Sequence, residues 1–329
     1  MMGDPHLGCP VIHVTGTNGK TSAVRMIGDL LMAHGLRTGV FTSPHLERVE
    51  ERVAVDGKAL TSEEFAAAVS SVQPFVDLYT ERTGDGITYF ELTAAVAFSA
   101  FALHAVDVAV VEVGLGGRLD ATNVVAPAVA AVTRVACDHT GYLGDSLAAI
   151  AAEKVAIVKP GSVFVTGDFY PEALEVAARR AEELGVTWRH YGRDYAAVEP
   201  ALALGGWRCD ISGIYETYAD VLLRLHGRHQ VENFALAVAA TEEFFGRALA
   251  TDAVEAAAAG ATSPGRMEVI NRRPLVVIDG AHNPDGLAAL AAALVEDFPP
   301  AGWHLVVGMR GARDPAEMLE PLQGIVTAV

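Results

Sequence analysis

Cysteine is scarce in this sequence, and the spacing of the cysteines does not indicate a pair. The three cysteines, Cys9, Cys137 and Cys209, lie far apart, are odd in number and form no CxxC motif. The sequence therefore predicts no disulfide framework of the kind that holds small secreted domains together. The pattern instead favours reduced thiols in a cytoplasmic protein.

Long apolar runs and an excess of positive charge are lacking as well. The longest helical apolar stretch, 92–106, is interrupted by polar residues and falls short of the ~20 residues that a membrane-spanning helix needs. Lys and Arg total 24 against 41 Asp and Glu, a net charge of −17. This balance argues against a nucleic-acid partner and against binding to an anionic membrane surface. An anionic substrate would need a local basic site, and the lysines that could build one are Lys20, Lys58, Lys154 and Lys159.

Apolar residues, by contrast, are plentiful. Hydrophobic residues make up 51% of the 329, which is enough to bury a sizeable core. At roughly 100–200 residues per domain, this length suggests two domains. Segments 107–113 and 128–135 are continuously apolar, which is typical of strands buried on both faces of a parallel sheet. Because helical patterns separate the predicted strands, we expect an α/β fold, a P-loop-containing mostly parallel sheet with helices on both faces.

A change of pattern divides the chain into two parts. Strand-like pieces at 207–211 and 221–225 suggest an antiparallel excursion within the first part. The segment 262–265 has the composition of a linker, so we expect a first domain at 1–262 and a second, smaller α/β domain at 263–329. The elements expected in the second are a strand at 275–279, a helix at 285–297 and a strand at 304–309. Two βα units are few for a sheet, so this domain is expected to be cut short.

A glycine-rich turn lies between a strand predicted at 10–14 and a helix predicted at about 21–34. Residues 15–21 read Thr-Gly-Thr-Asn-Gly-Lys-Thr, and the backbone N–H groups of such a turn bind phosphate oxygens together with the helix N-terminus. Lys20 would neutralise phosphate charge, and the Thr21 hydroxyl would reach Mg²⁺. Val14 stands where the general motif has its first glycine, so the match is to a shorter variant. The alternative is an exposed turn that contains Gly and Lys by chance.

Two more groups of polar residues come directly after predicted strands. Glu112 ends one strand and has three glycines within the next five residues, and Asp138 and His139 follow another. Ligands bind at the carboxyl ends of strands in open α/β sheets, where a carboxylate or an imidazole could hold a cation. The alternatives are a loop in which Arg118 and Asp120 pair with each other, and a histidine with a purely structural role.

Each of three further groups of residues could have either a functional role or an ordinary structural one. Lys154 lies in the middle of a predicted helix, where most lysines are solvated surface residues. The polar residues around Asn233 could either recognise an adenine edge or cap a helix. Arg266, Asp279 and His282 could reach phosphates from the second domain, or belong to ordinary turns.

Together and in this order, these motifs resemble the Mur ligase superfamily, and within it the folylpolyglutamate synthase/dihydrofolate synthase branch. The segment Ser43-Pro44-His45-Leu46 separates this folate branch from the peptidoglycan branch. The resemblance covers about residues 10–320, and the segments that carry it are 15–22, 41–46 with Glu51-Arg52, 89–91, 112–123, 138–144, Glu153-Lys154, His229-Gln230 with Asn233, 264–266 and 279–284.

The resemblance implies a role for each matching residue. It assigns catalysis to Lys20, Lys154, His139 and Arg266. It assigns nucleotide binding to Thr17, Asn18, Gly19, Lys20, Thr21 and Ser22, to Asn233 at the adenine, and to Arg266, Asp279 and His282 at phosphate and ribose. It assigns metal binding to Thr21, Glu112, His139 and Lys154, the last because it matches a lysine that is carbamylated in many members. It assigns substrate binding to a mobile loop with Ser43, Pro44 and His45.

The resemblance also implies a reaction. ATP phosphorylates a substrate carboxylate to an acyl phosphate, the amine of L-glutamate attacks it, and phosphate leaves. The implied acceptor is a folate or dihydropteroate, and the residues do not choose between them. The implied cofactors are ATP and Mg²⁺, with a monovalent cation as a further candidate. We expect a monomer with small-molecule substrates, without nucleic-acid or membrane partners.

Departures from the family pattern leave other functions open. Family members run longer at both ends, and the loop here reads Gly-Lys-Thr-Ser in place of Gly-Lys-Gly-Ser. Phe234 replaces a small residue and is expected to crowd the adenine pocket. The alternatives are a truncated homologue that binds ATP without turnover, a Mur-type ligase with another acid acceptor, and a plain ATPase.

Overall fold

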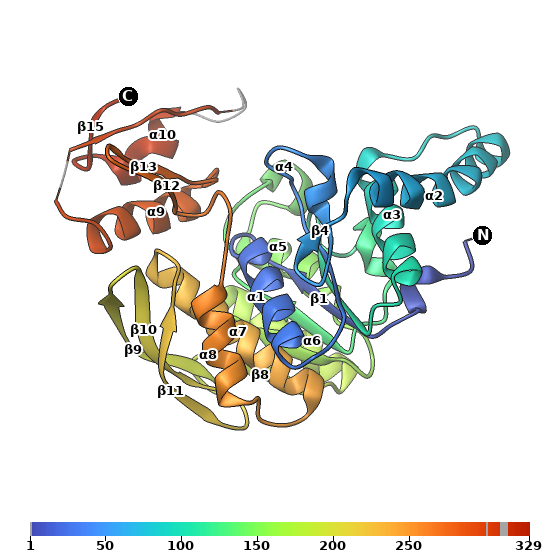
Figure 1. Cartoon of the computed structure of the whole chain (residues 1–329), viewed down its shortest axis with the longest axis horizontal. Helices are drawn as coiled ribbons and strands as arrows, with labels where there is room; N and C mark the ends of the chain where they lie inside the picture. The colour runs from blue at the N-terminus through green and yellow to red at the C-terminus, as the bar shows by residue number, and fades with distance from the viewer. Residues whose placement is uncertain (1, 301, 310–314) are drawn as a thin grey trace.

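The computed structural model describes residues 2–300, 302–309 and 315–329 and shows two units (Figure 1). The larger, which we call the central unit, surrounds an eight-stranded sheet. The smaller, which we call the C-terminal unit, follows residue 264 and lies at the upper left of Figure 1, beyond the strands β9–β11. No helix in the described part of the chain is long and apolar enough to cross a membrane.

The eight-stranded sheet has the order β4-β3-β2-β5-β1-β6-β7-β8. Its strands are β1 Val11–Thr15, β2 Thr38–Phe41, β3 Val53–Val55, β4 Lys58–Ala59, β5 Val108–Glu112, β6 Val129–Val132, β7 Val163–Thr166 and β8 Trp188–His190. The six from β2 to β8 along that order are parallel, and β3 and β4 add an antiparallel edge. Because parallel strands end at the same edge, the loops after β1, β5 and β6 open side by side.

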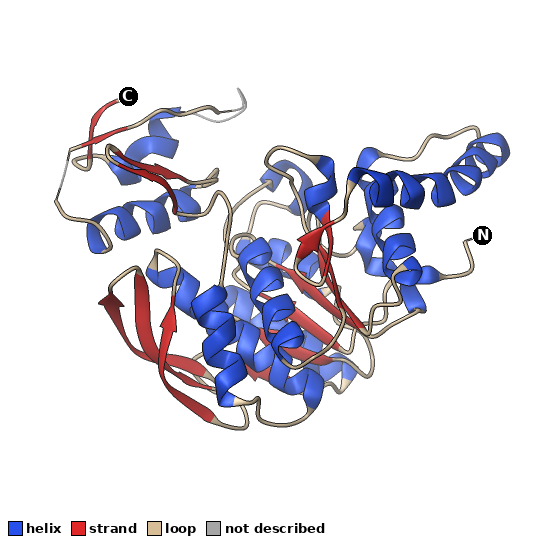
Figure 2. Cartoon of the chain, in the orientation of Figure 1, coloured by secondary structure: helices blue, strands red, loops and turns tan. Residues whose placement is uncertain are grey.

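Helices cover both faces of this sheet, as Figure 2 shows. They are α1 Lys20–Ala33, α2 Ser62–Thr83, α3 Tyr89–Leu103, α4 Thr140–Leu143, α5 Leu147–Val155, α6 Pro171–Leu184, α7 Arg228–Phe245 and α8 Thr251–Gly260. Thr61 and Thr88 begin α2 and α3 with capping boxes, in which each threonine and a glutamate three residues on satisfy backbone N–H groups.

The strand β5 shows why buried strands read as continuous apolar runs. Val108 and Val110 pack on the face covered by α1 and α7, whereas Ala109 and Val111 pack on the face covered by α2 and α3. All four side chains are at most 1% exposed. A strand with helices on both faces has no solvent side, so neither set of alternating positions needs polar residues. The predicted fold class is confirmed.

A separate three-stranded antiparallel sheet packs on α7 in the order β11-β10-β9. Its strands are β9 Ala196–Ala203, β10 Gly206–Ser212 and β11 Thr217–Leu223. The predicted pieces at 207–211 and 221–225 correspond to β10 and β11. The sequence reading missed β9, which contains Pro200 and is an edge strand, the position in a sheet that tolerates proline.

The C-terminal unit is small and only partly as expected. Its elements are β12 Glu268–Arg272, β13 Leu275–Ile278, α9 Pro284–Glu296, β14 Trp303–His304, α10 Pro315–Leu319 and β15 Val326–Ala328. The predicted strand at 304–309 is wrong beyond His304, because β14 is only two residues long and pairs with the short β15. The sequence reading also missed β12, which pairs with β13. Short 3-10 turns complete the chain at Pro5–Leu7, Val49–Arg52, Ala121–Val124 and Glu320–Leu322.

Candidate active site

A cavity of about 260 Å³ lies between the carboxyl ends of β1, β5 and β6 and the C-terminal unit. The sequence-predicted residues that line it are Thr17, Asn18, Gly19, Lys20, Thr21, Ser22, Ser43, Pro44, Glu112, His139, Lys154, Asn233, Arg266, Asp279 and His282. Of the predicted site residues, only His45 is not among those lining the cavity. Its Nδ1 instead accepts a hydrogen bond from Arg52 Nε at 2.9 Å. Residues more than 200 positions apart in the sequence thus line the same cavity.

The glycine-rich turn at residues 15–21, which we call the phosphate loop, is held in shape by the segment after β6. Thr133 Oγ1 donates to the carbonyl of Asn18, and Thr17 Oγ1 donates to the carbonyl of Ala136 at 3.1 Å. A side chain at Gly16 would collide with Thr133, and one at Gly19 would collide with the Asn233 amide. Gly19 also has φ +83°, which favours glycine. The glycines therefore let the loop fit between two neighbouring segments.

Lys20 bends back over its own loop. Its Nζ donates to the carbonyls of Gly16 at 2.9 Å and Thr17 at 3.1 Å. Burial lowers the pKa of Lys20, and the nearby Glu112 carboxylate opposes that shift. A cation held by carbonyls at the start of α1 faces the region where an anion would bind.

Thr21 and Glu112 form a direct pair across the end of the sheet. Thr21 Oγ1 donates to Glu112 Oε1 at 2.9 Å, and the backbone N–H of Ser43 donates to Glu112 Oε2 at 3.1 Å. Glu112 is 1% exposed, and burial raises its pKa while the charge of Lys20 lowers it. The pair presents a hydroxyl and a carboxylate, the hard oxygen donors that Mg²⁺ prefers.

Lys154 lies in the last turn of α5 rather than in the middle of a helix, and it is not the solvated surface lysine that the sequence pattern suggested. Its side chain is 3% exposed, and Nζ donates to the carbonyl of Gly16 at 2.9 Å. Two lysines, Lys20 and Lys154, therefore share one carbonyl of the phosphate loop. Burial, together with the charge of Lys20, lowers the pKa of Lys154 to about 7. A substantial part of its amine is consequently neutral and nucleophilic near neutral pH.

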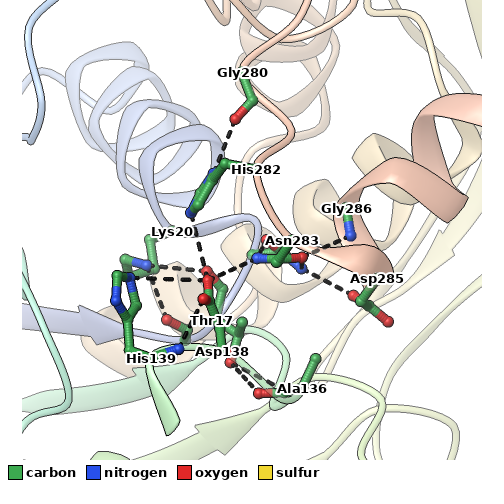
Figure 3. Close-up of polar contacts among 12 residues, drawn as sticks. Thr17, Lys20, Ala136, Asp138, His139, Gly280, His282, Asn283, Asp285 and Gly286 are labelled. Carbon is green, nitrogen blue, oxygen red and sulfur yellow. Dashed lines mark hydrogen bonds and ion pairs between the residues drawn. The ribbon is translucent and has the colours of Figure 1, made fainter. Parts of the chain in front are cut away.

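Asp138 is one of the residues through which the two units contact each other (Figure 3). Its Oδ2 lies 3.9 Å from His139 Nε2 and 3.5 Å from His282 Nε2. Ligand atoms of these three residues lie within 4.8 Å of one another, so the set could hold a metal ion. His139 therefore faces Asp138 and His282, and its predicted partnership with Thr21 and Glu112 in one metal site stays a prediction.

The C-terminal unit contributes Arg266, Asp279 and His282 from two adjoining turns. Asp279 accepts hydrogen bonds from the backbone N–H groups of Met267 at 2.8 Å and Ala281 at 2.7 Å. The Arg266 guanidinium donates to the carbonyl of Gly265 at 3.0 Å and lies so close to Gly280 that a side chain there would collide with it. The turn interpretation of these residues is thus correct for their backbone and does not exclude a role at the cavity.

The loop that follows Glu112 differs from the predicted alternative. Arg118 pairs with Glu153 at 2.9 Å rather than with Asp120. Asp120 instead accepts from the backbone N–H groups of Gly114 and Leu115, each at 3.0 Å. These bonds fix the loop beside Glu112 and give Asp120 a structural role.

Family models match both units of the chain. The model described as the Mur ligase middle domain matches residues 14–241, and the one described as the Mur ligase, glutamate ligase domain matches residues 265–329. The dihydrofolate synthase/folylpolyglutamate synthase of Mycobacterium tuberculosis is 39% identical over 346 residues, which cover 100% of this chain and 71% of that protein. The folylpolyglutamate synthase of Lacticaseibacillus casei is 35% identical, with 100% and 77% covered. This chain belongs to the folylpolyglutamate synthase/dihydrofolate synthase family of Mur ligases.

Solved structures of this family match nearly the whole of this chain. Mycobacterium tuberculosis folylpolyglutamate synthase complexed with ADP and AMPPCP matches with a TM-score of 0.95 at 39% identity, covering 99% of this chain and 75% of that one. A complex of folylpolyglutamate synthase with AMPPCP and folate matches with a TM-score of 0.94 at 34% identity, covering 100% and 81%. The chain is therefore an ATP-dependent ligase of the Mur type.

A second cavity of this ligase, about 320 Å³, lies behind the phosphate loop. Asn18, Gly19, His229 and Asn233 line both cavities, and Arg134, Asp168, Tyr170 and Glu232 are found only in the lining of the second. The expectation that Phe234 crowds this region is wrong. Phe234 is 1% exposed, belongs to the core cluster that includes α1 and lines neither cavity. Consecutive residues of a helix point about 100° apart, so Phe234 packs into the core while Asn233 lines both cavities.

Sequence reasoning gave no role to three residues that join the units in this ligase, although one of them, Asn283, lies in the segment 279–284 that carries the resemblance. Arg134, Asn283 and Asp285 connect the loop after β6 to the start of α9. One signal could have indicated Asn283, because Asn directly before Pro is a frequent helix start. Nothing in the local sequence indicated what the side chain would touch.

Proposed function

We propose that this ligase adds L-glutamate to the carboxylate of a folate, of dihydropteroate, or of both, through an acyl phosphate. One observation carries the proposal: Lys20, Thr21, Glu112 and Lys154 surround the same cavity as Arg266 and His282. The relatives named for folylpolyglutamate and dihydrofolate synthesis supply the substrate class. The division into domains at 1–262 and 263–329, the assignment as a monomer and the candidate monovalent cation remain part of this proposal.

In the proposed complex, the phosphates of ATP lie on the phosphate loop. The loop N–H groups and Lys20 bind the phosphate oxygens, while Arg266 and His282 approach from the C-terminal unit. Asn233 lies between the two cavities, so an adenine ring at its amide would be continuous with phosphates on the loop. Asp279 is assigned to the ribose.

The residues present fit a magnesium ion. Thr21 and Glu112 place a hydroxyl and a carboxylate 2.9 Å apart on the cavity wall, and His139 lines the same space. When bound, Mg²⁺ neutralises the charge that develops on the transferring phosphoryl group. Glu112 is held ready by the backbone N–H of Ser43.

Lys154 fits the proposed carbamylation. A neutral lysine amine can attack CO₂, forming a nitrogen–carbon bond and releasing one proton, and a pKa of about 7 makes that amine available. Because Lys154 lines the cavity, the carbamate would supply an additional anionic oxygen donor for a cation there. We assign this role to Lys154 on the basis of its burial, its pKa and its position.

The reaction then needs no covalent bond to the chain. The substrate carboxylate attacks the γ-phosphorus, the bond to ADP breaks, and the glutamate amine displaces phosphate from the acyl phosphate with loss of a proton. Lys20 and Arg266 stabilise the charge of the transferring group. The facing C-terminal unit limits water at a site where water would hydrolyse the intermediate. The loop with Ser43, Pro44 and His45 is assigned to the acceptor.

The test is phosphate release from purified protein with Mg-ATP and L-glutamate, with dihydropteroate in one reaction and tetrahydrofolate in another. We expect release that depends on both glutamate and a pterin acid, and a product one glutamate heavier by mass spectrometry. Bound ATP without release would favour a homologue that lacks turnover. Release without any acid acceptor would instead identify a plain ATPase.

A further inference from the structure

Asn283 joins the C-terminal unit to the phosphate loop by a closed set of hydrogen bonds (Figure 3). Its Nδ2 donates to Asn18 Oδ1 at 3.0 Å and to Asp138 Oδ2 at 2.9 Å. Its Oδ1 accepts from Asn18 Nδ2 at 3.1 Å and from the backbone N–H of Gly286 at 2.8 Å. The side chain is 0% exposed, and all four hydrogen-bonding positions of its amide are used.

Asp285 holds the same loop residue from two positions further on. Its Oδ2 accepts from Asn18 Nδ2 at 2.9 Å, and its two oxygens accept from Arg134 Nε at 3.1 Å each. Both amide hydrogens of Asn18 therefore end on the C-terminal unit, one on Asn283 and one on Asp285. An element of the other unit thus orients this side chain of the phosphate loop.

The far end of α9 is tied to the central unit in a different place. Asp297 accepts from Trp207 Nε1 at 3.1 Å, from His226 Nδ1 at 3.1 Å and from the backbone N–H of Gly227 at 2.8 Å. None of these three partners belongs to the phosphate loop. One helix is thus anchored at both ends, and only its N-terminal end contacts the loop. The difference separates docking of the unit from shaping of the loop.

We propose that Asn283 is a positioning residue that couples docking of the C-terminal unit to the conformation of the phosphate loop. With the unit docked, the paired amides of Asn283 and Asn18 fix the loop in the shape described above. With the unit displaced, Asn18 loses both partners and the loop loses that restraint. The proposal rests on the proposed nucleotide site, and it makes full order of that site depend on both units being together.

Asn283→Asp separates this coupling from helix capping. Asp caps a helix as well as Asn does, and its charge suits the first turn. The aspartate keeps the acceptor for Gly286, loses both donated hydrogen bonds and faces Asn18 Oδ1 and the Asp138 carboxylate with negative charge. If Asn283 only caps α9, the change should leave the order of the phosphate loop unaltered, whatever it costs the stability of the C-terminal unit. Asp297→Asn is the matched control, because it weakens the anchor at the other end of the same helix.

The first readout is amide hydrogen exchange of peptides that cover residues 15–20, measured on the full chain without nucleotide. We expect these peptides to exchange faster in Asn283→Asp, by about tenfold for the loss of a hydrogen bond to a charged group, and at the wild-type rate in Asp297→Asn. Equal exchange in wild type and Asn283→Asp would overturn the coupling. Equal acceleration in both variants would do so as well, since it would indicate general loosening of the unit.

The second readout is steady-state kinetics with ATP as the varied substrate, beside the thermal midpoint. Asn283→Asp should lower kcat/KM for ATP by about tenfold or more, and its buried charge beside Asp138 should also lower the midpoint. Asp297→Asn should lower the midpoint without this loss of kcat/KM, so the two measurements separate a change at the loop from a loss of stability. Combining Asn283→Asp with Asn18→Ala should add little further loss, because both changes remove the same contact. Fully additive losses would overturn the proposal. Wild-type protein without ligase activity would instead count against the proposed function and leave the exchange result standing as the test of the coupling.

Discussion

The two walls of the cavity differ in how deeply their charged side chains are buried. On the central-unit wall, Glu112 and Lys154 are at most 3% exposed and are held by main-chain groups of the loops after β1 and β2. On the C-terminal wall, the His282 side chain is 56% exposed and comes from a turn. The charged groups of the central-unit wall are therefore buried and held in place by the main chain. The groups on the opposite wall depend instead on how the C-terminal unit docks.

Lys20→Ala should have the largest effect, because it removes the cation that faces the phosphates on the fixed wall. We expect turnover to fall by about a thousandfold, with a far-ultraviolet circular dichroism spectrum like that of wild type. Lys58→Ala, at an exposed lysine, is the matched control and should keep full activity. Near-wild-type turnover of Lys20→Ala would remove the phosphate-loop assignment.

Lys154→Ala should rank second. We expect phosphate release to fall by about a hundredfold, because an anionic ligand and a contact to the phosphate loop disappear together. Added short carboxylic acids should restore part of the activity if a carbamate is what the lysine supplies. Activity equal to that of wild type would return Lys154 to a structural role despite its burial.

Glu112→Gln should reduce activity by a factor on the order of tens and raise the Mg²⁺ concentration needed for half-maximal rate. Stability should change little. Burial raises the pKa of Glu112, so its ionised form costs the folded state free energy above that pKa, and removing the charge offsets the loss of one accepted hydrogen bond. A magnesium titration and a melting curve of the same sample measure both quantities.

His282→Ala tests the opposite wall and should cost less, about tenfold in kcat, because this exposed residue assists without anchoring the site. The thermal midpoint should stay unchanged. A loss as large as that of Lys20→Ala would contradict the difference between the two walls, since it would place a dominant catalytic group on the exposed one.

The smallest expected effect is a pH dependence that comes from Lys154. Its pKa of about 7 means that the amine is protonated below that pH and neutral above it. The carbamylated fraction, followed by NMR with ¹³C-labelled bicarbonate, should therefore rise several-fold as the pH increases by about one unit through that value. Arg cannot form a carbamate at these pH values, so Lys154→Arg should show no such signal.

The central unit could largely be predicted because its signals are local. A strand buried on both faces is largely apolar, and the phosphate loop needs glycines at fixed places, so the bounds predicted for β1 and α1 agree with the structure within one or two residues. The antiparallel strands β3, β4 and β9 lie at or near sheet edges and were not predicted. Such strands carry neither a long apolar run nor a clear alternation of apolar and polar residues. The segment 305–309 was assigned to a strand because an apolar run does not reveal whether a partner strand is present.

The sequence by itself determined the α/β class, the family and most of the residues that meet at the cavity, because each depends on residue types at short spacing. The contacts of Lys154 and Asn283, whose roles the sequence left open, are visible only in the folded chain. Lys154 became a buried amine because α5 packs beneath the phosphate loop, and Asn283 became more than a helix cap because α9 docks against Asn18. A side chain's solvent exposure and partners depend on elements distant in the chain, and local patterns do not record them.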